Sequence, residues 1–494
     1  MAHITSTSLG RNALLLAATS AGSYLFGVLR DRLLANTLGA SRDVDIFNSA
    51  FLLPDLIMNL FAAAITTAFI PVLAKSKRQY QSTNEILTVI VICIIFMDVV
   101  AWVLLPWIVT IIAPGFNPTE LAQLTSSSRW LLLSPLLFGI SILLGTLLQS
   151  KHHFLAYAIS PMLYNVGICI GIIWLTPITG VLIGAGLHLF IRLIAVIRLR
   201  YWPRFATTIF HSLEVTQTLK LIGPRIIGLL AIQATLWTYN AVGSTLEPGS
   251  VAVFNFGRNF QSLPVSFIGI ALATVLFPVL AQNFAATNTI QLLDNTRKAV
   301  RMIIFLTLPA MIGMMFVSQP LVSVFLGGGE FDAAAITRTS WALLIFALVI
   351  PLESLQHILA RVFYAQHNTK TPAWVGVAGA VLNVIVCLVA AQWFGVIGLV
   401  LGFIATTAFI DIALLWWLAD HGQRVIDRSI QVTFGKCLIA SGVMMLGLTG
   451  LFLLPVSQLI QLIVITGTGI LLYIMTAQLL RVSEMKQLVT IMRR

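Results

Sequence analysis

The chain contains few charged residues. Asp, Glu, Lys and Arg make up only 9% of its 494 residues, whereas 58% are hydrophobic, and the mean hydropathy is +0.96. A soluble globular protein carries about 25% charged residues. The composition therefore excludes a soluble enzyme or binding module and indicates an all-α polytopic membrane protein.

The sequence also lacks motifs that several classes of protein require. The cysteines, Cys93, Cys169, Cys387 and Cys437, lie in apolar segments without CxxC or metal-ligand spacing, so they are interpreted as core residues. No GxSxG, HExxH or P-loop motif occurs, which disfavours hydrolysis and ATP-driven transport by this chain. We expect no organic cofactor and no structural metal. A membrane-embedded glycan enzyme stays the weaker alternative, because the loops around 113–128 and 326–338 are short.

Apolar runs of about 20 residues, the length that crosses a bilayer, occur fourteen times. They centre on residues 12–36, 46–74, 86–112, 129–150, 154–177, 179–199, 218–245, 249–283, 300–325, 339–365, 371–393, 395–419, 433–455 and 458–481. Only TPITG separates the fifth from the sixth, and only QWFG separates the eleventh from the twelfth.

Basic residues gather in alternate loops. One set of loops and the C-terminal tail contain Lys75, Lys77, Arg78, Lys151, Arg198, Arg200, Arg204, Arg297, Lys298, Arg301, Lys370, Arg424, Arg428, Arg493 and Arg494. The opposite set has little beyond Arg42, Arg129 and Arg338. The positive-inside rule predicts that both termini are cytoplasmic. The net charge of +12 is thus explained by topology, and we expect no nucleic-acid partner.

Two halves of the chain resemble each other. Residues 46–74 and 250–282 share F-N, L-P and a terminal PVLA, and Asn165 in 154–185 matches Asn383 in 368–402. The repeat predicts an N-terminal lobe (1–205), a C-terminal lobe (206–425) and two extra helices (426–494). Internal repeats around a polar site are typical of secondary transporters. The alternative is that duplication only builds a stable bundle.

Among the arginines inside predicted spans, Arg30 in the first and Arg258 in the eighth are the candidates for a ligand contact. An arginine at the centre of a span costs roughly 2.5–3.5 kcal/mol, so it is usually retained for a ligand or a pathway. Together they could clamp an anionic group such as a pyrophosphate. The alternative is a buried salt bridge of Arg258 with Asp55 or Asp31. Neighbouring helical residues point about 100° apart, so Arg30 and Asp31 are predicted not to face each other, and Arg32 is predicted to snorkel.

Further polar residues in spans could couple transport to an ion. Glu353, His357 and Arg361 follow an i, i+4, i+8 spacing, which places them on one helical stripe. The stripe predicts either proton or ion coupling or a polar ridge that lines a hydrated cavity or the seam between the two halves. His188 and Arg192 repeat the i, i+4 spacing, and the same alternatives apply to them.

Oxygen-bearing side chains suggest a weaker cation site. Asn240, Asn383, Thr407 and Asp411 could offer oxygens to a cation such as Na⁺. Asp98, in the third span, is predicted to be the partner of another helix.

Nine segments together resemble the MurJ (MviN) family of the multidrug/oligosaccharidyl-lipid/polysaccharide exporter superfamily. They are LFGVLRDRLLANTLGAS, the D-x-F-x-x-A-F-x-L-P-D run from Asp45 to Asp55, AFIPVLA, IIAPGF, FLAYAISPMLYNVG, GPRIIGL, LPVSFIGIALATVLFPVLAQ, FLGGGEFDAAAITR and FYAQHNTKTP. The segments occur in the family's order and cover essentially the whole chain.

The resemblance implies a lipid II flippase of peptidoglycan synthesis in the bacterial cytoplasmic membrane. It implies fourteen spans, two six-helix lobes around a cationic cavity, and a groove for the polyprenyl tail along the last two spans. Transport would proceed by alternating access, driven by Na⁺, H⁺ or the membrane potential. Cell-wall synthesis proteins are expected as further partners.

The resemblance also implies site residues. Arg30 and Arg258 fall on family arginines, and Asn240, Asn383 and the polar end of span twelve fall near positions that coordinate Na⁺ in some members. Tyr24, Met58 and Asn59 stand where the family has charged residues.

The predicted function is a lipid II flippase. Its substrate contacts are predicted to be Arg30, Asp31, Asp55, Arg258 and Asn259. The alternatives are a flippase for another polyprenyl-linked glycan, a cation-coupled drug antiporter of the same superfamily, and a non-transporting scaffold for cell-wall enzymes.

Overall fold

The computed structural model describes residues 6–64, 78–151, 153–206, 213–452 and 456–485, without the side chains of 6–18, 20, 21, 63, 64, 213–228 and 452. Apart from an isolated bridge between Gly328 and Phe331, the regular structure in these ranges is helical. The predicted all-α class is therefore confirmed.

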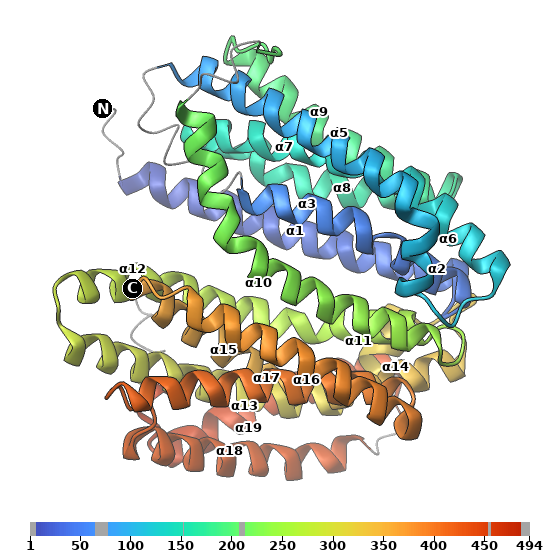
Figure 1. Cartoon of the computed structure of the whole chain (residues 1–494). Helices are drawn as coiled ribbons and strands as arrows, with labels where there is room; N and C mark the ends of the chain where they lie inside the picture. Colours follow the sequence, from blue (N-terminus) through green and yellow to red (C-terminus); the bar gives the residue numbers. More distant parts are fainter. Residues whose placement is uncertain (1–5, 65–77, 152, 207–212, 453–455, 486–494) are drawn as a thin grey trace. The chain divides into compact units, whose positions relative to one another are not determined.

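Contacts between residues divide the chain into two compact units, 1–249 and 250–494. The helices of the first unit, coloured from blue to green, lie along one another in a bundle (Figure 1). They are α1 (Ser6–Leu38), α2 (Arg42–Ala50), α3 (Leu52–Ala64), α5 (Gln79–Ile112), α6 (Pro118–Leu131), α7 (Leu133–Ser150), α8 (Phe154–Trp174), α9 (Pro177–Arg198) and α10 (Leu213–Ser244). α10 packs against α3 and α5.

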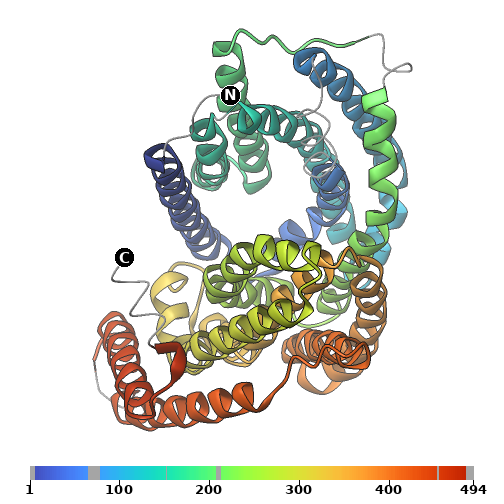
Figure 2. The same cartoon turned by 90° about the vertical axis from the view of Figure 1, so that its left-hand side faces the viewer.

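The second unit contains the remaining helices. They are α11 (Ser250–Pro264), a π-helical turn (Val265–Ile270), α12 (Ala271–Ala285), α13 (Thr289–Phe325), α14 (Ala333–Phe346), α15 (Val349–Ala365), α16 (Lys370–Phe394), α17 (Val396–Asp420), α18 (Arg428–Phe452) and α19 (Gln458–Leu479). The red helices α18 and α19 pack against each other and against α13 (Figure 2). Tyr473 on α19 donates a hydrogen bond of 2.6 Å to the Phe305 carbonyl on α13.

Within the described residues, eleven helices or continuous helical runs are long and apolar enough to cross a membrane. The number becomes twelve if α14 and α15, which are bent by 46°, form one span. The chain is therefore a multi-pass membrane protein. Each of the fourteen predicted runs overlaps one helix or consecutive helical elements, although the ends of the second and thirteenth runs, 65–74 and 453–455, lie outside the described residues.

Each of the two short separators predicted from the sequence contains a helix end: α9 begins at Pro177 within TPITG, and α16 ends at Phe394 within QWFG. Thr176 caps α9, because its hydroxyl accepts the Thr179 N–H at 3.2 Å and Pro177 begins the helix. Gly395 ends α16 with a φ of +55°, a conformation that an L-residue with a side chain adopts only with strain. Sharp turns at these positions allow each pair of helices to fold back on itself.

Small residues bring the α8–α9 pair and the α16–α17 pair into close contact. A methyl group on Gly171 would collide with Gly180, and one on Gly167 would collide with Gly184. On α17, Gly402 approaches Cys387 of α16 in the same way. In a membrane, where lipid tails are as apolar as the side chains, such backbone approach is a main source of helix association. These two pairs are the segments that the predicted repeat matched.

Candidate functional site

Arg30 on α1 forms an ion pair with its neighbour in sequence. Its Nη2 and Nε atoms lie 2.7 and 3.0 Å from Asp31 Oδ1, and the two side chains are 27% and 14% exposed. The prediction that these residues do not face each other is wrong. Their Cβ atoms do diverge by 100°, but the long arginine stem lets the guanidinium bend back to the carboxylate.

The same guanidinium also contacts α8. Arg30 Nη1 donates to Asn165 Oδ1 at 3.2 Å, and the Asn165 amide donates to the carbonyl of Ser23 on α1 at 3.3 Å. Asn165 thus ties α1 to α8 and fixes one edge of the Arg30 guanidinium. The guanidinium is held by both neighbours and remains only partly exposed.

Asp55 on α3 belongs to the same polar region. Arg30 and Asp55 both interact electrostatically with Tyr164, the residue before Asn165 on α8. Asp55 is half-buried. We call Arg30, Asp31, Asp55, Tyr164 and Asn165 the first-unit cluster. It combines three predicted substrate contacts on two helices with two residues of α8.

Tyr24, Met58 and Asn59, which stand where the resemblance implies charged residues, add no charge to this cluster. Tyr24 and Asn59 are exposed and Met58 is half-buried. Arg32 is exposed, and its carbonyl accepts a hydrogen bond of 2.9 Å from Asn36.

Arg258 on α11 lies in the second unit and is held by an aromatic ring. Its guanidinium carbon is 5.3 Å from the ring centroid of Phe403 on α17, a cation–π distance. The side chain is half-buried, and no carboxylate pairs with it among the described residues of its unit. Its charge is therefore available to an anion. The neighbouring Asn259 is exposed.

Two predicted coupling residues, Thr407 and Asp411, lie on the same face of α17 as Phe403. Phe403, Thr407 and Asp411 are spaced four residues apart and so share one face of the helix. The Thr407 hydroxyl donates to the Phe403 carbonyl at 2.9 Å. Asp411 is 3% exposed, and neither of its carboxylate oxygens has a hydrogen-bond partner among the described residues.

Glu353 on α15 lies near this carboxylate. Its Oε2 accepts a hydrogen bond of 2.9 Å from Gln261 on α11, and Glu353 also acts electrostatically on Asp411 and on His357. α11, α15 and α17 pack against one another. We call Arg258, Gln261, Glu353, His357, Thr407 and Asp411 the second-unit cluster.

Two predicted cation ligands lie elsewhere. Asn383 on α16 is fully buried, and its amide donates to the Thr406 hydroxyl at 3.1 Å, on a different face of α17 from Asp411. Asn240 on α10 belongs to the first unit. It accepts from the Ser49 hydroxyl and donates to the Ile112 carbonyl, both at 2.9 Å. Both amides therefore already serve helix packing.

His188 and Arg192 share a spacing with Glu353 and His357 but not their environment. Arg192 is 3% exposed and donates to Ser160 Oγ at 2.8 Å and to the Ser141 carbonyl at 2.9 Å. His188 Nδ1 lies 2.8 Å from Ser141 Oγ. These two residues connect α7, α8 and α9 inside the first unit. The prediction of a ridge along a hydrated cavity is wrong for this pair.

Sequence reasoning did not assign three residues of the clusters, Tyr164, Asn165 and Gln261. Of these, Asn165 was noted only because it matches Asn383 in the repeat. A polar side chain within a span was the available signal for all three. Which partner each one takes depends on helix packing.

Comparison with known proteins identifies a family. The family model described as "Lipid II flippase MurJ" matches residues 34–469. The chain is 26% identical over 457 residues to a "Probable lipid II flippase MurJ" of Rickettsia prowazekii, covering 88% of this chain and 89% of that protein. It is 24% identical over 480 residues to the corresponding protein of Thermotoga maritima, covering 94% and 95%.

Solved structures show the same fold. A "Lipid II flippase MurJ, inward closed conformation" superposes with a TM-score of 0.80 at 20% identity, covering 94% of this chain and 98% of that one. An inward-facing multidrug resistance MATE family transporter of the MOP superfamily superposes with a TM-score of 0.65 at 14% identity, covering 81% and 95%. At these identities the likeness establishes the fold alone.

Proposed function

The chain belongs to the lipid II flippase MurJ family, and we propose that it moves the polyprenyl-diphosphate-linked peptidoglycan precursor from the cytoplasmic to the outer leaflet by alternating access. The family consists of membrane transporters and not of enzymes, which agrees with the absence of a catalytic motif in the sequence. Lipid II is accordingly the expected substrate.

The main support for the proposed substrate contact is that the Arg258 guanidinium has an aromatic ring beside it but no carboxylate partner among the described residues of its unit. A half-buried arginine in a membrane span without a carboxylate partner is costly unless an anion binds there. In this proposal Arg258 and Arg30 hold the diphosphate, because guanidinium groups offer bidentate donors to phosphate oxygens and do not lose their charge. Asn165 keeps the Arg30 guanidinium oriented, and Asp31, Asp55 and Asn259 contact the polar head of the substrate.

The second-unit cluster is the proposed site of coupling. An ionised Asp411 without a partner would cost several kcal/mol at this degree of burial, and uptake of H⁺ or a monovalent cation removes that cost. Na⁺ fits less well, because the Asn383 amide and the Thr406 hydroxyl are engaged with each other and Thr406 lies on a different face of α17 from Asp411. We therefore assign H⁺ uptake to Asp411, with Glu353 and His357 as titratable neighbours and Thr407 as a polar neighbour.

The proposed topology has fourteen spans and two cytoplasmic termini. α1 and α10, with 33 and 32 residues, would be about 48–50 Å long at 1.5 Å per residue, which exceeds a hydrocarbon core of about 30 Å. Together with the twelve candidate spans they make fourteen. The lobes 1–205 and 206–425 would exchange access, and the polyprenyl tail would lie along 426–494.

Complementation tests the function and the phosphate contact together. Wild type, Arg258→Ala and Arg338→Ala are expressed in a bacterium depleted of its own lipid II flippase, with membrane levels measured. We expect rescue by wild type and by Arg338→Ala, which removes an arginine outside the cluster, and no rescue by Arg258→Ala. Rescue by all three would keep the flippase and reject the contact. Failure of wild type at normal abundance would favour another polyprenyl-linked glycan.

Coupling is tested separately in vesicles. We expect an imposed H⁺ gradient to accelerate flipping by wild type and not by Asp411→Asn, while a Na⁺ gradient of equal size has no effect. The reverse response would move the assignment from H⁺ to Na⁺. A drug antiporter, in contrast, would export cationic compounds and leave lipid II in place.

A further inference from the structure

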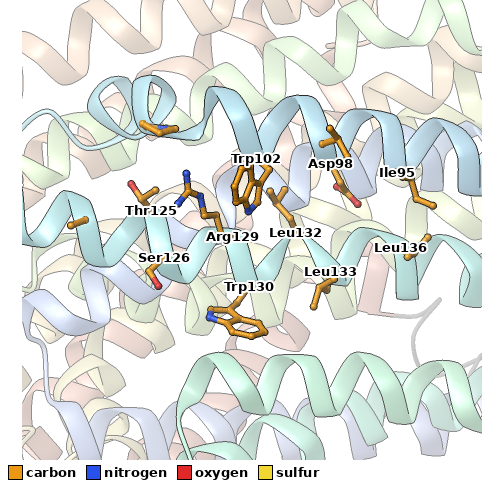
Figure 3. Close-up of a pocket in the computed structure, with 13 residues that line it drawn as sticks. Ile95, Asp98, Trp102, Thr125, Ser126, Arg129, Trp130, Leu132, Leu133 and Leu136 are labelled. Carbon is orange, nitrogen blue, oxygen red and sulfur yellow. The ribbon is translucent and has the colours of Figure 1, made fainter.

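A groove of about 800 Å³ lies between α5 and the α6–α7 run (Figure 3). Asp98 and Trp102 of α5 line one side, and Arg129, Trp130 and Leu133 of α6 and α7 line the other. No residue of the first-unit cluster lines it, so the groove is separate from the proposed substrate contacts.

Arg129 supplies a positive charge to the groove. Its guanidinium carbon lies 4.3 Å from the ring centroid of Trp102. Its Nε atom is buried and has no hydrogen-bond acceptor among the described residues, and no carboxylate there pairs with it. Figure 3 shows the guanidinium beside the indole of Trp102, on the groove side of α6. A cation held in this way is suited to bind an anion.

Asp98 supplies a negative charge in the same groove. It lies one helical turn before Trp102, and its Oδ1 is buried without a donor among the described residues. The prediction that Asp98 pairs with another helix is therefore wrong. A buried polar atom left without a partner destabilises the folded protein, and such atoms commonly mark a missing ligand or water. A ligand that carries both an acceptor and a charged donor would satisfy both residues.

The walls of the groove indicate that this ligand is a lipid. Val99, Trp102, Trp130 and Leu133 are between 49% and 60% exposed, and they lie on candidate membrane spans. Apolar surface exposed on a span faces acyl chains, and tryptophan is enriched where chains meet headgroups. The groove thus combines a surface for acyl chains with two charged groups of opposite sign.

We propose that this groove binds a zwitterionic phospholipid with a primary ammonium group, of the phosphatidylethanolamine type. The phosphate accepts hydrogen bonds from Arg129, the ammonium donates to Asp98, and the acyl chains lie along the exposed apolar residues. Phosphatidylglycerol would leave the Asp98 charge unneutralised, and phosphatidylcholine has no N–H donor for it. The proposal does not depend on flippase activity.

Native mass spectrometry of the full-length protein in detergent, with equal amounts of the three lipids, tests the proposal. We expect wild type to retain phosphatidylethanolamine about fivefold better than either competitor, the ratio that one partly exposed ion pair provides. Arg129→Gln should lose retention of all three lipids. Asp98→Asn should keep binding but lose the preference for ethanolamine over choline. The matched control Arg198→Gln, at an exposed arginine of α9, should behave as wild type.

Equal retention of the three lipids by wild type, or unchanged retention by Arg129→Gln, would overturn the proposal. A second measurement covers the case in which Arg129→Gln does not fold. Brominated phosphatidylethanolamine should quench tryptophan fluorescence of wild type more than brominated phosphatidylcholine does, and the difference should disappear in Trp102→Phe. Equal quenching by the two lipids would also refute the headgroup selectivity.

Discussion

The ion pair between Arg30 and Asp31 gives a way to separate substrate binding from structural support. In Arg30→Ala, two effects occur together: the proposed phosphate contact is lost, and Asp31 loses the guanidinium that lies 2.7 Å away. In the double variant Arg30→Ala/Asp31→Asn, no unpaired carboxylate remains. Comparison of the two variants therefore isolates the role of the guanidinium.

The expected losses of stability and of substrate binding can be worked out from the contacts of Arg30. Removing one partner of a fully buried ion pair costs about 3–5 kcal/mol. Because Arg30 and Asp31 are 27% and 14% exposed, solvent screening reduces the expected cost of Arg30→Ala to about 1–3 kcal/mol. The double variant should recover most of this stability. Loss of a phosphate contact should cost about 2–5 kcal/mol of binding, which is roughly 30-fold to several-thousand-fold in transport rate.

The assay has two readouts. Thermal unfolding of purified protein in detergent measures stability, and the rate at which a fluorescent lipid II analogue becomes accessible to an impermeant quencher measures flipping in vesicles. We expect Arg30→Ala to be destabilised and inactive, and Arg30→Ala/Asp31→Asn to be close to wild type in stability but still inactive. Asp31→Asn alone should lose about as much stability as Arg30→Ala, because it leaves the Arg30 guanidinium without its carboxylate, but it keeps the guanidinium and should retain part of the flipping activity.

One outcome would refute the reasoning directly. If the double variant flips lipid II at the wild-type rate, the Arg30 guanidinium only neutralises Asp31 and does not contact the diphosphate. An inactive double variant that is also as unstable as Arg30→Ala would instead point to the Asn165 hydrogen bond as the main structural role of Arg30.

Three further predictions concern stability. Gly171→Val should destabilise the protein by about 1–3 kcal/mol, because the new side chain would collide with the backbone of α9. The control Gly186→Ala should leave thermal unfolding unchanged, because no atom lies within 4 Å of the added carbon. Arg192→Met should lower stability by about 1–3 kcal/mol through lost buried hydrogen bonds, while flipping per folded molecule is unchanged. Asp427→Ala should lower the free energy of unfolding by about 0.5–2 kcal/mol, because the Asp427 carboxylate accepts the Ile430 N–H at 2.9 Å at the start of α18. The difference in stability between this variant and wild type should shrink as the pH falls below about 4.

The sign of the pH effect follows from the surroundings of Asp427, which precedes the span formed by α18. Partial burial would raise the pKa of its carboxyl, but hydrogen bonds from Ser429 and Ile430 and the nearby Arg297 and Arg301 lower the pKa below its ordinary value. A lowered pKa in the folded state adds stability above the unfolded pKa, and this stability is lost as the pH falls through the folded pKa. A difference that grows on acidification would contradict the assignment.

The predictions for the variants of Gly171 and Arg192 can also be contradicted by experiment. Equal stability of Gly171→Val and Gly186→Ala would mean that α8 and α9 do not approach as closely as described. Loss of flipping in a stable Arg192→Met would give that residue a part in transport.

The sequence by itself determined the class of protein and the places where helices turn back. A helix must bury about 20 apolar residues to cross the bilayer, so spans are recognisable without any knowledge of their neighbours. TPITG and QWFG could be identified for the same local reason, because Thr-Pro starts a helix and glycine ends one. Arg30 and Arg258 were identified as site candidates because an arginine within a span is costly wherever it lies.

Only the tertiary structure decided which polar residues meet. The Arg30–Asn165 contact joins residues 135 positions apart, and the Gln261–Glu353 contact joins residues 92 positions apart. His188 with Arg192 and Glu353 with His357 have the same spacing, yet the first pair is buried among helices. The second pair belongs to the cluster around Asp411, whose carboxylate has no hydrogen-bond partner in the part of the chain that the structure describes. Helical periodicity fixes which face of a helix a side chain occupies, but the packing of other helices fixes what that face contacts.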